Sequence, residues 1–272
     1  MTEHRIAQVV VACDAVGENQ ASIEAAARLA DWLHAALRGI FVEDEALLHL
    51  TAIPPVRYVG STGESFAAID ERTVLHHFEA HAARMRAVLE AAARARELGW
   101  TFDVVRGQPN MAILNTSDED LLVIEMQSRP FAGSARLASR LLTGAVQSER
   151  PILLLRNGAD ATHDIICLIQ GTGESAARLV VFTARLASAG KRSLTLFLAS
   201  NAIDERAALE LVRSASPELA ERCRIDRPSH TVLAGTAAAG RLLVVDADPT
   251  INDAAALKNL LATTQADILF LR

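Results

Sequence analysis

Aromatic side chains are scarce in this sequence, at 4% of 272 residues, although half of the residues are apolar. The interior must therefore consist mainly of alanine, leucine, valine and isoleucine, which is typical of parallel β-sheets covered by helices. The length suits two medium-sized domains with ample core. No apolar run approaches the roughly 18 residues of a membrane span, so we expect no membrane association and a cytoplasmic protein.

Cysteine is also rare, and the three residues Cys13, Cys167 and Cys223 have neither metal-ligand spacing nor a disulfide framework. Val10 to Cys13 formally match a lipoprotein cleavage box, but the preceding apolar run is short and contains Gln8. The same residues fit a first β-strand better. Two of the cysteines lie inside apolar runs, where a free thiol behaves as a small hydrophobic side chain.

Positive charge is not in excess, because the net charge is -6 and the pI is near 5.8. A surface for nucleic acid or anionic membranes would need a basic stripe, so neither partner is expected. No Ser-His-Asp, Cys-His or paired-carboxylate arrangement stands out for catalysis. We therefore expect a non-enzymatic protein whose partner is another protein or a small ligand.

A strand-loop-helix-strand unit between Asp120 and Arg156 is the most informative stretch. Leu121 to Ile124 form an apolar run that predicts a buried strand, and Ser134 can cap the amphipathic helix that follows. Ile152 to Leu155 predict a second buried strand. Two apolar strands joined by an amphipathic helix indicate a parallel sheet with covered faces.

The same order of elements occurs twice, which indicates a tandem repeat. We predict two α/β domains, 1–157 and 158–272, each a doubly wound parallel sheet of five strands. A long helix from about Glu71 to Leu98 is expected in the first domain, and a shorter one at Asp204–Ser214 replaces it in the second. Residues 45–70 are expected to form a long connection. The matching strands are Ile6–Asp14 with Asp164–Gln170, Leu37–Asp44 with Ser193–Ala199, Leu121–Glu125 with Leu242–Asp246, and Ile152–Arg156 with Ile268–Arg272.

This order resembles the universal stress protein family, in which a glycine loop, G-x2-G-x9-G-[ST], follows the fourth strand. Gly144 stands where the family has its last glycine, but Ala145 replaces the hydroxyl residue, and Ser134 and Phe131 replace the earlier glycines. The resemblance implies the adenine nucleotide alpha hydrolase-like fold of universal stress proteins. It also implies a stress-response or regulatory binding role, with a degenerate ATP-binding motif and weak or no ATP binding.

The candidate nucleotide site lies in the first domain. Asp14 ends the first strand at the carboxyl edge of the sheet, and the resemblance places it at the adenine-ribose, with the backbone near Val42 lining the base. Asp14 can equally cap the following turn. An anion could be held by Arg129, Gly133, Ser134 and Arg136, although a solvated loop before a capped helix is the alternative. The second candidate function is therefore an ATP or AMP binder, with slow ATPase activity at most, using this domain alone.

The second domain offers less for a nucleotide. Gly171 to Ala176 formally match the G-x-G-x-x-A dinucleotide fingerprint, but no acid for a ribose ends the next strand, and the glycines can serve a tight turn. Asp246, Asp248 and Asp253 lie in the region of the glycine loop, where they would repel a phosphate.

Histidines gather on the long predicted helix, at His76, His77 and His81. His77 and His81 share a helix edge, which suits a metal, but further ligands are not displayed. A solvated helix rim explains them better, and no metal site is predicted.

Each domain ends in an apolar strand that needs a partner if it lies at a sheet edge. Universal stress proteins commonly pair these last strands across a two-fold axis. Here the short linker from Asn157 to His163 holds the two copies together. We therefore expect an intramolecular pseudo-dimer, and a further homodimer remains open.

Overall fold

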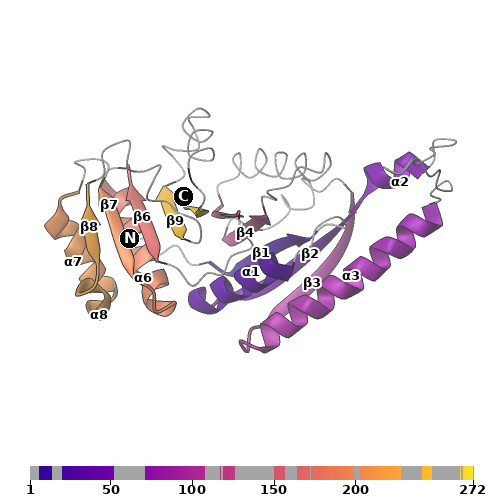
Figure 1. Ribbon diagram of the computed structural model, residues 1–272, viewed down its shortest axis with the longest axis horizontal. Coiled ribbons are helices and arrows are strands. Elements are labelled where there is room, and N and C mark those ends of the chain that lie inside the picture. Colours follow the sequence, from indigo (N-terminus) through magenta and orange to yellow (C-terminus); the bar gives the residue numbers. More distant parts are fainter. Residues whose placement is uncertain are drawn as a thin grey trace, which may run out of the picture.

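The computed structural model describes residues 6–13, 20–51, 71–107, 117, 119–125, 150–156, 164–171, 173–198, 203–227, 241–246, 264 and 266–271. The described strands form one ten-stranded sheet that fans across the molecule (Figure 1). Its strand order is β3-β2-β1-β4-β5-β10-β9-β6-β7-β8.

The ten strands fall into two halves of the same design. The first half contains β1 (Gln8–Cys13), β2 (Ala36–Asp44), β3 (Trp100–Gly107), β4 (Asp120–Glu125) and β5 (Ile152–Leu155). The second half contains β6 (Ile165–Ile169), β7 (Leu194–Leu198), β8 (Arg224–Asp226), β9 (Leu242–Asp246) and β10 (Asp267–Leu271). All pairs within a half are parallel, and both halves repeat one order, with β6 to β10 in the places of β1 to β5. The predicted doubly wound parallel α/β architecture is confirmed.

Five described helices cover one face of this sheet along both halves, and a sixth, α2, packs beside α3. The helices are α1 (Gln20–Leu33), α2 (Glu45–Thr51), α3 (Glu71–Arg94), α6 (Gly173–Ala189), α7 (Glu205–Ala215) and α8 (Pro217–Ala220). α1 and α3 lie along the first half and α6 to α8 along the second (Figure 1). Their apolar stripes and alternate strand residues form one continuous core, in which the Phe41 and Phe78 rings meet edge to face at 6.4 Å. A second apolar cluster occupies the opposite face of the sheet.

Three elements differ from the expectations. Residues 45–51 form α2 directly after β2, where a long connection was predicted. α3 ends at Arg94 rather than near Leu98, because Glu97 adopts a left-handed conformation with φ of 54°. β8 was not located from the sequence, because its three residues have no apolar run.

The halves join where β5 and β10 pair in antiparallel fashion, with Leu154 opposite Ile268 and Leu153 opposite Leu269. The last strands therefore pair with each other, as their sequences suggested. A polar clamp extends this seam, since the Arg156 backbone N–H donates to the Asp267 carboxylate at 2.8 Å. The Arg156 guanidinium also donates to the Thr264 carbonyl.

The described helices include none that is both long enough and apolar enough to cross a bilayer.

Candidate functional site

The topological switch points of the sheet are the natural places for a ligand. In doubly wound sheets, ligands bind beyond the carboxyl ends of the strands, where neighbouring crossovers diverge to opposite faces. The strand order places these points between β1 and β4 in the first half and between β6 and β9 in the second. The side chains at the ends of β4 and β9 therefore decide which chemistry each crevice accepts.

Both switch points hold a serine hydrogen-bonded to a carboxylate. Ser22 in the first turn of α1 donates its hydroxyl proton to Glu125, the last residue of β4. Ser175 in the first turn of α6 donates in the same way to Asp246, the last residue of β9. The arrangement is therefore built twice from equivalent elements, although the acids differ by one methylene group.

Both pairs are partly shielded from solvent, since one member of each is buried and the other, Glu125 or Ser175, is half-buried. Ser22 is 1% exposed and Asp246 is 7% exposed. The hydrogen bond holds each carboxylate beside the first turn of a helix, where unpaired backbone N–H groups and the helix dipole favour a negative charge. A phosphate would bind at the same position, so it would compete with the carboxylate for the same N–H groups and helix dipole.

Gly171 packs directly against the serine–carboxylate pair of the second half. A Cβ atom at this position would lie 2.7 Å from the Ser175 hydroxyl oxygen and 2.9 Å from an Asp246 carboxylate oxygen. Only glycine lets the backbone pass so close to this pair. The first glycine of the formal dinucleotide fingerprint therefore accommodates a carboxylate of the chain.

One of the predicted nucleotide-site residues lies within the described part of the chain. Val42 is 4% exposed in β2, sits opposite Val105 of β3, and belongs to the apolar cluster on the sheet face away from the described helices. The other five lie outside the described residues, so the predicted grouping of these residues stays a prediction. They are Asp14, Arg129, Gly133, Ser134 and Gly144.

Ser22 and Ser175 were missed by the sequence reasoning. Glu125 and Asp246 had already been matched as the ends of corresponding strands, but serines in early helical turns are common caps and gave no separate signal. The usable signal was their recurrence, because each serine occupies the first turn of the helix that follows the first strand of its half.

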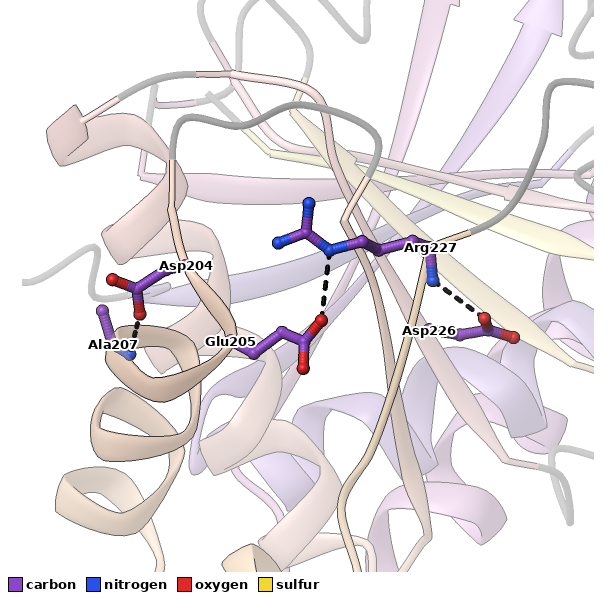
Figure 2. Close-up of polar contacts among 5 residues, drawn as sticks. All are labelled: Asp204, Glu205, Ala207, Asp226 and Arg227. Carbon is purple, nitrogen blue, oxygen red and sulfur yellow. Dashed lines mark hydrogen bonds and ion pairs between the residues drawn. The ribbon is translucent and has the colours of Figure 1, made fainter.

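A second group of charged residues lies at the end of β8 and the start of α7 (Figure 2). Asp204 caps α7 by accepting from the Ala207 N–H at 2.7 Å, and Asp226 accepts from the Arg227 N–H at 2.8 Å. The Arg227 guanidinium bonds Glu205 at 3.1 Å. Figure 2 shows Asp204 turned toward Ala207, and Glu205 and Asp226 turned toward the side chain and the backbone of Arg227, so this group caps a helix and pairs charges without converging on one point.

The histidines of α3 do not converge either. His76 lies 3.9 Å from Glu79 on the exposed side of the helix, and His81 is half-buried. Among the residues that the structure describes, no group of three metal-ligating side chains gathers.

Burial raises the pKa values of two thiols, which makes them unsuited to nucleophilic chemistry at neutral pH. Burial raises the pKa of Cys167 from 9.0 to about 12, although a hydrogen bond with Thr183 lowers it somewhat. Burial also raises the pKa of Cys223 to about 11. A nucleophilic cysteine needs a lowered pKa, so these two are packing residues.

The arrangement of elements matches known structures. A universal stress protein from Archaeoglobus fulgidus DSM 4304 matches with a TM-score of 0.60 over 99% of this chain and 97% of its own, at 12% identity. This chain has the universal stress protein fold. A functionally unknown protein from Pseudomonas aeruginosa PAO1 matches with a TM-score of 0.56 over 98% of this chain and 93% of its own, at 13% identity.

A protein of Pseudomonas aeruginosa UCBPP-PA14, assigned to the universal stress proteins, matches with a TM-score of 0.56 over 98% of this chain and 94% of its own, at 14% identity. No protein-family model and no curated protein matches the sequence. Structural matches at such low identity establish the fold alone, so function has to be argued from the two switch points.

Proposed function

We propose that this chain is a non-enzymatic stress-response protein of the universal stress protein type, acting in the cytoplasm as a regulatory binding protein. Residues 1–157 and 158–272 are its two domains, joined as an intramolecular pseudo-dimer through β5 and β10. The proposal is supported by the fold and by the serine–carboxylate pairs at both switch points.

The carboxylates of Glu125 and Asp246 carry the argument against ATP. Each follows directly on the apolar strand where nucleotide-binding members of the family begin their glycine loop. A fixed negative charge there repels a triphosphate, and partial burial strengthens that repulsion. The adenine-nucleotide alternative would have to use the first domain, with Asp14 and Val42 at the base.

Calorimetric titration of the full chain with Mg-ATP tests this proposal. We expect no saturable heat and no phosphate release above the background rate. Micromolar affinity that is lost in Asp14→Ala would instead establish the adenine-nucleotide alternative. Glu125→Gln and Asp246→Asn retain an oxygen that accepts from serine but remove the charge, so ATP binding gained by either variant would identify repulsion as the cause.

A deletion strain tests the stress-response role separately. Loss of the gene is expected to lower survival after starvation or oxidative challenge, and wild-type protein should restore it. Asp14→Ala should restore survival equally, because the proposed role does not use a nucleotide. Unchanged survival of the deletion strain under both challenges would contradict the role.

A further inference from the structure

The two ends of the ten-stranded sheet differ in length. β3 at one end has eight residues and pairs only with β2 among the described strands. β8 at the other end has three residues, two of them exposed charged residues, Arg224 and Asp226. Short, charged edge strands resist pairing with another chain, whereas long edge strands invite it. Among the described strands, β3 therefore offers the edge that can accept another strand.

Val104 lies in the middle of this open edge and is 50% exposed. It is the only large hydrophobic side chain classed as exposed in the described part of the chain. The charges beside it are already engaged within the chain. Arg38 pairs with Asp103 at 2.8 Å, and Glu43 pairs with Arg106 at 2.9 Å. These cross-strand pairs with β2 reduce the protection that edge charges normally give.

The helix α3 packs over both β2 and β3. A Cβ atom built on Gly39 of β2 would lie 2.6 Å from Leu89 of α3, which places that helix close above β2. α3 also packs against β3, where Phe102 meets the same position at 2.7 Å. Val104 nevertheless stays half-exposed beneath this layer.

We propose that β3 is a dimerisation edge, at which a second copy of this chain adds its own β3 in antiparallel fashion. A two-fold axis perpendicular to the sheet keeps α3 of both copies on one side. Opposite side chains then lie on the same face, so only registers that centre on a residue are allowed. Centring on Asp103 or on Val104 gives the two longest overlaps of an eight-residue strand.

The positions of the charged residues favour one of these two registers over the other. Centring on Asp103 places that carboxylate opposite its own copy, which is destabilising. Centring on Val104 places Val104 opposite Val104, Phe102 opposite Arg106, and Asp103 opposite Val105. This register brings the two valines into apolar contact and opposes no like charges. The edge is therefore complementary to itself in one register, which favours a second copy over an unrelated peptide.

Sedimentation of the full chain tests the interface. Wild-type protein is expected to sediment as a dimer, and not as longer assemblies, because β8 cannot extend the sheet. Val104→Lys opposes two like charges at the axis and should raise the dissociation constant roughly tenfold or more. Val104→Thr keeps a β-branched residue and should remain dimeric. Circular dichroism and thermal melting confirm that each variant is folded.

Cysteine cross-linking tests the register. In an antiparallel pair, directly opposite Cα atoms lie about 4.5–5.5 Å apart, within the range of a disulfide. Val104→Cys should therefore give a covalent dimer on mild oxidation. Thr101→Cys is the matched control, because in this register it lies six positions from its own copy, about 20 Å away.

Three results would overturn the proposal. The first is a wild-type chain that stays monomeric at every accessible concentration, whether or not it binds an extended peptide. The second is a Val104→Lys variant that is folded and still dimeric, and the third is equal cross-linking of the two cysteine variants.

Discussion

In the part of the chain that the structure describes, three residues other than glycine hold left-handed backbone conformations. His34, Glu97 and Lys191 have φ values of 52°, 54° and 52°. Each follows a helix, and the next residue donates its N–H to a carbonyl five residues earlier, as Ala35 does to Ala30 at 2.9 Å. This closes the helix and turns the chain toward the next strand, although a left-handed L-residue costs about 1–2 kcal/mol. His34 and Lys191 occupy equivalent turns of the two halves.

Cys167 gives a pH-dependent prediction at the same scale. Its pKa is about 12 in the folded chain, against 9.0 ordinarily, because burial disfavours the thiolate. The unfolded chain therefore loses this proton first, and the stability contributed is complete below pH 9 and is lost as pH rises from 9 toward 12. Urea denaturation should show a steeper alkaline loss of unfolding free energy in wild type than in Cys167→Ala.

The comparison rests on the slope with pH, because the cavity in Cys167→Ala lowers stability at every pH. Iodoacetamide gives an independent measurement, since Cys167 should react only after unfolding. Rapid alkylation of Cys167 in the folded chain at neutral pH would contradict the raised pKa.

At the scale of elements, the packing of α3 on the first half depends on Gly39. The close approach of Leu89 and Phe102 to this position leaves no room for a methyl group. Gly39→Ala should therefore lower the unfolding free energy by about 1–3 kcal/mol, as overpacking does. Urea denaturation measures the change.

Gly99 is the matched control, because a Cβ there meets nothing within 4 Å and its φ lies outside the left-handed region. Gly99→Ala should be neutral or slightly stabilising, since alanine restricts the unfolded chain. Equal losses in the two variants would mean that α3 is not held at the described distance from β2.

The whole molecule depends on the seam between the halves. β5 and β10 pair there, and beside them Arg192 of the second half lies over the Trp32 ring of α1 at 5.7 Å. Gly190 lets that ring pack closely, since a Cβ would come 2.9 Å from it. One continuous sheet and one shared helical layer therefore unite the two halves.

A paired substitution tests the seam directly. Leu153 lies opposite Leu269, so Leu153→Cys with Leu269→Cys should form an intramolecular disulfide. It should raise the melting temperature relative to the reduced form, because it closes a long loop in the unfolded chain. Leu155→Cys with Leu269→Cys is offset by two positions and should stay reduced. Equal oxidation of both pairs would argue against the antiparallel register.

Much of the fold could be predicted because the relevant patterns are local. Buried parallel strands appear as apolar runs, and the repeated order of these runs predicted two equal half-sheets. α2 was missed because its seven residues carry too little periodicity to distinguish a helix from a connection. β8 was missed because an edge strand of three residues, two of them charged, does not require an apolar pattern.

By itself, the sequence determined which segments are buried, their order, and that the chain repeats, because burial of apolar side chains is encoded along short stretches. Tertiary structure decided the character of the switch points. Ser22 and Glu125 are 103 residues apart, and Ser175 and Asp246 are 71 apart, so no local pattern links them. It also decided that β5 meets β10 while β3 stays at an open edge. Such contacts depend on strand order in space, which is fixed only when the helices and strands pack together.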